Sequence, residues 1–484
     1  MRQNTFLVDI YFCCIEKIVR FIKTALRFAF AGACSKNVST QPHAVIIAYT
    51  CWPLWGSEPE VGWRWAIEAG KSAKVHVITR KEAENFIREY IKKNGEVPNV
   101  NFIIKDFPLL SRWIKGVRFN RIHYIFWQFL AIKEILKMNK KDAVDIVHHV
   151  TFVNIWIPAF AMLLPFHTVW GPTGANLGIP KQFKKRMGLS FSERLIDWFR
   201  KFLIQRLSAI NPVLHMAYIG AERIIVINAD CKELIPYRYQ CKVQISSANG
   251  VSSYEFITRS PKPDEVRILY VGRLLNFKGI HFAVRAFDKF LRGINYIAKF
   301  IIITGQNYDT DNPKFHRFLR SGEEQEQKRT PPGKHEEREL LRLIGYIEQR
   351  GIEPYVEIYG GMSGERVMEE IKQAHILLFP SFEGGGMVVL ESLSVGIPLV
   401  CFDTGGAGEY VDSTCGIKIE IGEYDECVEK LSHALMKLST DLELWKTLSR
   451  GGLKRIKDFY LWSHKGELIA KCYNELMNQN SAVN

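Results

Sequence analysis

Residues 379–409 read FPSFEGGGMVVLESLSVGIPLVCFDTGGAGE, and this stretch indicates the fold more clearly than any other part of the chain. A short apolar run at 376–379 stops at Pro380, as a buried parallel strand would. Three glycines at 384–386 then precede an apolar segment, and a second apolar run follows at 399–402. The order strand, glycine-rich loop, helix, strand predicts an α/β protein. In such proteins this loop presents backbone N–H groups and a helix N-terminus to an anion.

The bulk properties of the chain indicate a globular protein with basic surfaces. Its 484 residues predict two domains, and its 47% hydrophobic and 24% charged residues are ordinary for a globular chain. The formal charge of +14 predicts basic patches on the surface. The ten cysteines form no C-x-x-C pair, which favours a reducing compartment over a zinc site or a disulfide framework. We expect no membrane-spanning helix, because the chain has no run of 18 or more apolar residues.

The first forty residues form an apolar segment interrupted by positive charge. Lys17, Arg20, Lys23 and Arg27 recur at steps of three, three and four, which places them along one side of a helix. This pattern predicts that residues 1–40 form an amphipathic helix lying in the interface of an anionic membrane. The alternative is a helix packed on the protein's own surface with its basic side in solvent. A cleaved signal peptide is disfavoured, because arginines interrupt the apolar region.

Residues 41–250 are expected to form a first domain built on a parallel sheet. A strand at 44–49, a loop containing Gly56, a helix from about Val61 and a strand at 74–79 make a βαβ unit. Gly56 lacks the spacing G-x-G-x-x-G, which disfavours a nicotinamide cofactor.

Two adjacent histidines, His148 and His149, end another predicted strand of this domain. Polar residues at the carboxyl end of a strand lie where open α/β sheets bind ligands, so one imidazole could accept a proton or bind a sugar hydroxyl. A histidine with a purely structural role at a domain interface is the alternative. A metal pair is disfavoured, because neighbours on a strand point to opposite faces and no third ligand is apparent. A later strand ends at Trp170 and Gly171.

Two stretches of the first domain, 112–127 and 181–206, interleave basic and aromatic residues. This composition is typical of surfaces that bind nucleic acid or an anionic bilayer. The chain has no nucleic-acid recognition motif, so the membrane is favoured. The alternative is a solvated basic face with its aromatic residues in the core.

Residues 251–455 are expected to form the second domain. A strand at 266–271 ends in Gly272 and Arg273, and Lys278 precedes the next predicted helix. Both cations therefore lie at the carboxyl end of a strand, in front of a helix N-terminus. There a guanidinium can bind phosphate through two hydrogen bonds, and a lysine adds a point charge.

Two segments of the second domain are predicted to be surface loops. Asp309 and Asp311 resemble the D-x-D pair that holds a metal and a nucleotide in some enzymes, but they lie in a polar, turn-rich stretch. Residues 321–337 are charged and contain proline, which is typical of a surface excursion.

Taken together, these residues resemble the retaining glycosyltransferases of family 4, which have the GT-B architecture. The resemblance covers nearly the whole chain after about residue 41. Its main features are Glu383 and Glu391 in an E-x7-E arrangement and the motif G-R-x4-K-G at 272–279. Two segments are similar to a bacterial polysaccharide-synthesis branch of the family: GSEPEVGWRWA at 56–66 and VWGPTG at 169–174.

The resemblance implies an α/β protein of two Rossmann-like parallel-sheet domains facing a cleft, preceded by the N-terminal amphipathic helix. Residues 456–484 would form a helix that crosses back to the first domain. Arg273 and Lys278 would stabilise the diphosphate that leaves with the nucleotide. Glu383 would contact the donor sugar, and Glu391 would bind the ribose. No obligatory metal or other cofactor is expected, because the two cations can do the work of a metal.

The expected site residues fall into three sets. The expected catalytic residues are Arg273, Lys278, Glu383 and His148. The expected donor-binding residues are Gly56, Gly272, Gly384, Gly385, Gly386, Met387 and Glu391. The candidate acceptor or cleft residues are His149, Trp170 and Gly171.

The chain departs from the family pattern at two places. The family often has H-x-H after its fourth strand, whereas this chain has His148 next to His149, which leaves open which of them faces the cleft. The turn after Ile303 reads Gly305-Gln306-Asn307, without the usual second glycine, and this leaves the nucleotide-base pocket undefined.

The expected function is the transfer of a hexose from a nucleotide sugar to a lipid-linked or oligosaccharide acceptor, with retention of anomeric configuration. The expected setting is cell-surface polysaccharide synthesis at the cytoplasmic face of the membrane, with an anionic membrane surface and no nucleic acid as partner. The alternatives are a sugar-nucleotide epimerase of the same architecture and a non-catalytic membrane-associated scaffold. The sequence does not distinguish front-face attack from a covalent intermediate.

Overall fold

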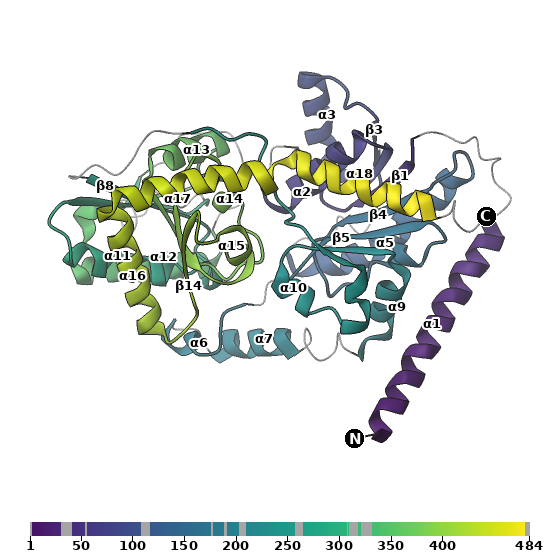
Figure 1. Cartoon of the computed structure of the whole chain (residues 1–484), viewed down its shortest axis with the longest axis horizontal. Coiled ribbons are helices and arrows are strands. Elements are labelled where there is room, and N and C mark those ends of the chain that lie inside the picture. Colours follow the sequence, from purple (N-terminus) through teal and green to yellow (C-terminus); the bar gives the residue numbers. More distant parts are fainter. Residues whose placement is uncertain are drawn as a thin grey trace. The chain divides into compact units, whose positions relative to one another are not determined.

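The computed structural model in Figure 1 shows a chain of helices and parallel sheets. The described residues are 2–30, 41–53, 56–107, 117–175, 178–187, 191–202, 210–256, 265–306, 308, 318–320 and 332–479. The chain divides into two compact units. The first unit is Met1–Ala175, Arg200–Asn249 and Trp462–Asn484, and the second unit is Asn176–Phe199 and Gly250–Leu461.

The first unit is built on a seven-stranded parallel sheet with the strand order β3-β2-β1-β4-β5-β6-β7. Its strands are β1 (His43–Ala48), β2 (Lys74–Thr79), β3 (Val100–Ile104), β4 (Ile146–Thr151), β5 (His167–Thr173), β6 (Arg223–Val226) and β7 (Val243–Ile245). The central strands β1 and β4 are buried along their whole length, as expected for a sheet covered on both faces. The short edge strands β3 and β7 were not predicted.

The main helices of the first unit are α1 (Arg2–Phe30), α2 (Ser57–Gly70), α3 (Glu84–Asn94), α5 (Val117–Asn139), α9 (Pro212–Gly220), α10 (Ala229–Glu233) and α18 (Trp462–Gln479). Helix α2 begins four residues earlier than the predicted Val61, because Pro59 lies in its first turn, where a missing N–H costs nothing. The C-terminal helix α18 packs against α2 within this unit (Figure 1).

Helix α1 packs on the first unit through one of its sides. Ile15 and Val19 are buried, and the Lys23 ammonium donates a hydrogen bond to the Gly220 carbonyl at the end of α9 (2.7 Å). Burial lowers the pKa of Lys23 to about 8. The prediction of one basic stripe is therefore corrected: Lys23 faces the protein, because its side chain satisfies a carbonyl at the end of a neighbouring helix.

The opposite side of α1 combines exposed aromatic and basic residues. Phe21 and Phe28 are 74% and 81% exposed. Lys17, Arg20 and Arg27 are exposed as well. The packing matches the alternative of a helix on the protein's own surface, and the position in a membrane interface stays a prediction. No helix among the described residues is long and apolar enough to cross a membrane.

The second unit is built on another seven-stranded parallel sheet, with the strand order β10-β11-β9-β8-β12-β13-β14. Its strands are β8 (Glu265–Val271), β9 (Ile297–Ile303), β10 (Leu319–Arg320), β11 (Val356–Tyr359), β12 (Ile376–Phe379), β13 (Leu399–Phe402) and β14 (Gly416–Ile419). Two parallel, doubly wound sheets confirm the predicted α/β class with two Rossmann-like domains.

The main helices of the second unit are α6 (Phe183–Arg186), α11 (Ile280–Arg292), α12 (Lys334–Arg350), α13 (Gly364–Gln373), α14 (Met387–Ser394), α15 (Gly405–Tyr410), α16 (Tyr424–Thr440) and α17 (Leu442–Arg455). A π-helical turn, Ile456–Tyr460, follows α17. Ser363 accepts a hydrogen bond from the Arg366 N–H and so caps α13, as helix N-termini prefer.

The segment 176–199 belongs to the second unit, although it was expected in the first domain. The reason is packing: the fully buried Phe183 ring lies against Phe282, Phe382 and Phe402.

The two basic, aromatic stretches differ in the exposure of their aromatic residues. In helix α7 (Phe191–Phe202) the exposed aromatic residues are Phe191, Trp198, Phe199 and Phe202. In the stretch 112–127, Tyr124 and Trp127 are buried in the core of the first unit.

Candidate active site

The carboxyl ends of β8 and β12 lie side by side, because these strands pair in parallel near the middle of the second sheet. From β8 the chain continues to β9 on one side, whereas β12 is followed by β13 on the other side. Such a reversal of strand order opens a crevice at the carboxyl ends, where open α/β sheets bind their ligands. The predicted cation loop follows β8, and the predicted glycine-rich loop follows β12.

These two loops are in direct contact. The Phe382 N–H donates to the Phe277 carbonyl (2.8 Å), and the Ser381 hydroxyl donates to the same oxygen (3.4 Å). Gly279 has φ +73°, and a Cβ there would lie 1.8 Å from the Pro380 carbonyl oxygen. Only glycine permits this close approach, which holds the cation loop against the glycine-rich loop.

The contact brings two predicted catalytic residues together. The Lys278 ammonium forms an ion pair with the Glu383 carboxylate, and the two side chains are 18% and 17% exposed. Below them the Tyr270 hydroxyl donates to the Lys278 carbonyl (3.1 Å). Burial, together with the nearby Glu383 charge, raises the pKa of Tyr270 well above its ordinary value. The site thus combines a partly shielded cation and a partly shielded anion.

Arg273 extends from the same loop, and its side chain is 55% exposed. Its Nη2 and Nε atoms donate to the Glu336 carboxylate at 2.5 and 3.2 Å. Glu336 was not predicted as a site residue, because residues 321–337 were expected to be a surface loop. In the structure α12 begins at Lys334, and the buried Glu336 lies in its first turn. A glutamate three residues after the N-cap is one half of the capping-box signal for a helix start, and here the Gly333 N–H donates to the Glu336 carboxylate (2.7 Å).

The glycine-rich loop leads directly into α14. Gly386 has φ +137° and forms the N-cap, so Met387 is the first helical residue. Met387 and Glu391 are four residues apart and therefore lie on one side of the helix. Gly272 lies at the end of β8, where its N–H donates to the Ile303 carbonyl (2.9 Å). The loop and helix place Gly384 and Gly385 near the same end of the sheet.

In the first unit, Gly56 forms the N-cap of α2 with φ +71°. Its N–H donates to the Glu60 carboxylate (3.0 Å), and a Cβ there would meet no atom within 4 Å. Backbone conformation rather than crowding therefore requires glycine at this position.

His148 is fully buried in the first unit, with both ring nitrogens hydrogen bonded. Nε2 donates to the Gly171 carbonyl (2.7 Å), and Nδ1 accepts from the Tyr473 hydroxyl of α18 (2.8 Å). Burial lowers the pKa of His148 to about 4, so the ring is neutral at pH 7. This placement matches the structural alternative for the histidine, and its catalytic role stays a prediction.

The three candidate acceptor residues are buried as well. His149 lies at 2.6 Å from the Tyr124 hydroxyl, and burial lowers its pKa to about 3. The Trp170 ring stacks on Tyr218 with the ring centres 5.4 Å apart. Gly171 has φ +141°, and a Cβ there would lie 2.2 Å from the Ile225 carbonyl oxygen. Packing accounts for all three residues, so the structure gives the acceptor prediction no support.

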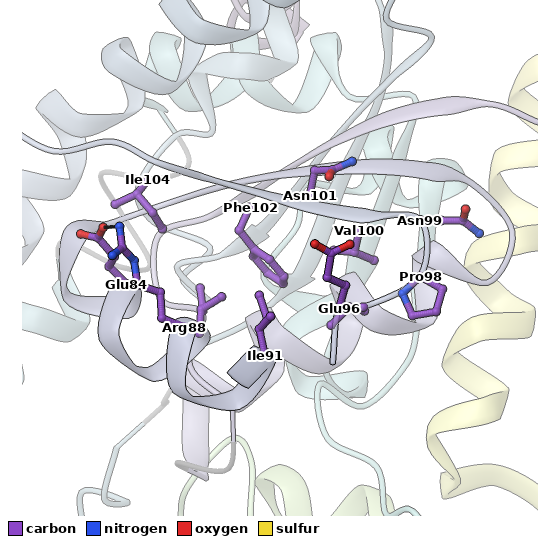
Figure 2. Close-up of a pocket in the computed structure, with 12 residues that line it drawn as sticks. Glu84, Arg88, Ile91, Glu96, Pro98, Asn99, Val100, Asn101, Phe102 and Ile104 are labelled. Carbon is purple, nitrogen blue, oxygen red and sulfur yellow. Dashed lines mark hydrogen bonds and ion pairs between the residues drawn. The ribbon is translucent and has the colours of Figure 1, made fainter. Parts of the chain in front are cut away.

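A pocket of about 570 Å³ lies elsewhere in the first unit, between α3 and the edge strand β3. Figure 2 shows the Phe102 ring at its centre, with Glu84 and Arg88 on one side and Glu96 on the other. None of the predicted site residues lines this pocket.

No group of three or more His, Cys, Asp or Glu side chains is placed to hold a metal ion in the part of the chain that the structure describes. Asp309 and Asp311, the D-x-D pair, lie outside the described residues. The expectation of a metal-independent site stays a prediction.

Comparison with known proteins gives matches to glycosyltransferases. Residues 254–444 match the family described as Glycosyl transferases group 1. A sucrose synthase of Denitrovibrio acetiphilus is 30% identical over 135 residues, which are 26% of this chain and 17% of that protein. An uncharacterised glycosyltransferase of Methanocaldococcus jannaschii is 24% identical over 420 residues, which are 81% of this chain and 93% of that protein.

Solved structures resemble the chain over most of its length. The structure of Anabaena HepE in complex with UDP and glucose matches with a TM-score of 0.55 and 13% identity, over 90% of this chain and 100% of that chain. At this identity the likeness establishes the fold, which is the GT-B fold of two Rossmann-like domains. Residues 254–444 therefore form a domain of the glycosyl transferases group 1 family, in a chain that has the GT-B fold.

Proposed function

We propose that this protein is a retaining glycosyltransferase of family 4, which transfers a hexose from a nucleotide sugar to a lipid-linked or oligosaccharide acceptor. One observation carries the proposal: Arg273, Lys278 and Glu383 come together at the carboxyl ends of β8 and β12. The match of residues 254–444 and the likeness to a protein solved with UDP and glucose support the same reading.

The chemistry of sugar transfer suits this arrangement. The bond between the sugar C1 atom and the diphosphate oxygen breaks, and the nucleoside diphosphate leaves with the electron pair. The acceptor hydroxyl oxygen forms the new bond to C1 and releases its proton, which is taken up by the departing diphosphate or by solvent. Negative charge develops on the leaving oxygen, where Lys278 and Arg273 stabilise it without a metal ion. The N-terminus of α14 adds a positive partial charge on the same side of the sheet.

The other proposed contacts with the donor come from the glycine-rich loop, α14 and the end of β8. Glu383 binds the hydroxyls of the donor sugar, and the backbone of Gly384, Gly385 and Gly386 approaches the phosphates. Met387 and Glu391 lie on the side of α14 that binds the ribose. Gly272 brings its backbone close to the diphosphate. His148 is left out of this set, because both of its ring nitrogens are already hydrogen bonded.

The membrane part of the proposal rests on α1. Phe21 and Phe28 lie on its exposed side with Lys17, Arg20 and Arg27, and this combination suits insertion between anionic headgroups. A peripheral position on the inner face of the cell membrane would bring the enzyme to a lipid-linked acceptor of cell-surface polysaccharide synthesis.

Isothermal titration with UDP, GDP, ADP, CDP and dTDP tests the donor site. We expect at least one nucleotide to bind, and the corresponding nucleotide sugar to support transfer. Lys289→Ala removes an exposed lysine of α11 that pairs with Glu429 and lies outside the proposed site. As a control for loss of a lysine, this variant should bind the same nucleotides as the wild-type protein. The proposal is wrong if none of the nucleotides binds. Isomerisation of the donor sugar without any acceptor would instead identify an epimerase.

A further inference from the structure

Gln306, Glu336 and Arg273 form a hydrogen-bonded cluster beside the proposed donor site. We infer that Glu336, supported by Gln306, is a positioning residue that holds the Arg273 guanidinium in the orientation needed to bind the leaving diphosphate. The inference rests on the proposed function only in naming the diphosphate. The contact itself is a property of this chain.

Each oxygen of the Glu336 carboxylate has its own partners. Oε2 accepts from the Gly333 N–H (2.7 Å) and so ties the carboxylate to the start of α12. Oε1 accepts from Arg273 Nη2 (2.5 Å) and from Gln306 Nε2 (2.9 Å). The side chain is 6% exposed, and an anion so buried persists only when it is hydrogen bonded. Helix α12 therefore fixes the carboxylate, and the carboxylate fixes the arginine.

The geometry at Arg273 leaves a phosphate-binding edge open. A guanidinium has five N–H groups, and Glu336 takes only those of Nε and one of Nη2. Three N–H groups have no partner among the described residues, and two of them, one on Nη1 and one on Nη2, point the same way and form the fork that binds two phosphate oxygens. Since the side chain is 55% exposed, this edge is accessible to a ligand. The carboxylate thus orients the arginine without occupying the edge that a diphosphate would use.

Glu336 is ionised at neutral pH. Burial alone would raise its pKa, but the hydrogen bonds from Arg273 and Gly333 outweigh burial and lower it. A charged partner holds a long arginine side chain in one geometry before the ligand arrives, and this preorganisation contributes about tenfold in affinity.

The cluster gives Gln306 a role. Gln306 follows Gly305 in the turn that lacks the usual second glycine of the family pattern, and its side chain extends to Glu336. In this chain the Gln306 amide is buried and donates to Oε1, so it stabilises the carboxylate at the position that Arg273 needs.

Transfer kinetics in a double-mutant cycle test the inference. We expect Glu336→Gln to lower kcat/KM for the nucleotide sugar about tenfold, and Gln306→Ala to lower it less. Glu337→Gln is the matched control, because it makes the same substitution at the exposed neighbouring residue and should leave kcat/KM unchanged. On an Arg273→Ala background, Glu336→Gln should have no further effect, since there is no guanidinium left to orient.

Two outcomes overturn the inference. One is a Glu336→Gln variant with the kcat/KM of the wild-type protein. The other is an equal loss on both backgrounds, which would show that Glu336 acts only through the stability of α12. Circular dichroism melting of each variant identifies any that do not fold, and Gln306→Ala, which leaves the helix cap intact, then replaces Glu336→Gln in the cycle.

A second readout does not depend on activity. Phenylglyoxal condenses with guanidinium nitrogens, and the hydrogen bonds to Glu336 occupy the Nε and Nη2 atoms of Arg273. We expect Arg273 to be modified faster in Glu336→Gln than in the wild type or Glu337→Gln, as measured by peptide mass spectrometry. An unchanged rate overturns the positioning contact. A faster rate in a protein that binds no nucleotide would retain the contact and reject the proposed function.

Discussion

The ammonium group of Lys278 and the carboxylate of Glu383 form an ion pair across 105 residues of sequence, between the loops that follow two neighbouring strands. Each charge therefore partly neutralises the other before any donor binds. A diphosphate entering this site must share Lys278 with Glu383, and its own negative charge would be repelled by Glu383 if the lysine were absent. Lys278 thus attracts the diphosphate of the donor, and the charge of Glu383 opposes its binding.

Removal of Lys278 should weaken nucleotide binding more than the loss of one hydrogen bond would. We expect Lys278→Ala to lower the affinity for the preferred nucleoside diphosphate by about 10- to 100-fold. The double variant Lys278→Ala/Glu383→Gln should recover part of this loss, because it removes the repelling carboxylate. Titration calorimetry of the four proteins in this cycle measures both effects. A double variant that binds more weakly than Lys278→Ala would contradict the repulsion argument.

Gly279 should tolerate no side chain. Its φ of +73° and the 1.8 Å approach of a Cβ to the Pro380 carbonyl predict that Gly279→Ala costs about 1–3 kcal/mol of unfolding free energy and separates the two loops. Gly345→Ala is the control, because Gly345 lies within α12 with no atom within 4 Å of an added Cβ. That substitution should stabilise the protein by about 0.5–1 kcal/mol. Urea unfolding gives both values, and equal stabilities would refute the close contact.

The buried imidazole of His148 should make the protein sensitive to acid. Its pKa in the folded state is about 4, below the ordinary value of 6.5, so between these pH values the unfolded chain binds more protons than the folded one. The unfolding free energy should therefore fall as the pH is lowered from 6.5 to 4, by at most about 1.4 kcal/mol per pH unit for this group. Urea unfolding of the wild type and His148→Gln at pH 7, 6 and 5 checks this, and we expect a shallower pH dependence in the variant.

The same variant separates a structural from a catalytic role for His148. Because its replacement disturbs hydrogen bonds to the Tyr473 hydroxyl and the Gly171 carbonyl, His148→Gln should be less stable at pH 7 by about 1–3 kcal/mol. The folded variant should keep most of its turnover. A variant of unchanged stability with a 100-fold loss of turnover would restore the catalytic assignment.

Membrane binding should depend on the exposed side of α1. We expect Phe21→Ser/Phe28→Ser to shift the protein from the pellet to the supernatant in sedimentation with anionic vesicles, because both rings are exposed beside basic residues. This variant is a sharper test than deletion of residues 1–40, which would also uncover the surface contacted by Ile15 and Val19. Phe256→Ser, at another exposed phenylalanine, is the control. An unchanged distribution would leave α1 with a structural role alone.

The sequence by itself determined the elements that carry the candidate site. The apolar runs before Gly272 and before Pro380, with glycines and helix starts after them, predicted β8, β12 and the loops that follow, and the structure has strands at these places. Such signals are local, because a buried strand requires a short run of apolar residues and a turn requires glycine at one or two positions.

The tertiary structure alone decided which side chains meet. Lys23 belongs to a regular basic pattern, yet it faces inward to the end of α9. His148 was predicted to end a strand, as a ligand-binding residue would, yet it lies inside β4 and both of its ring nitrogens are hydrogen bonded. Glu336 lies 63 residues from Arg273 in a stretch whose composition predicts a loop. These outcomes depend on long-range packing and on the partner that each buried polar group finds, and no local pattern of residues records that partner.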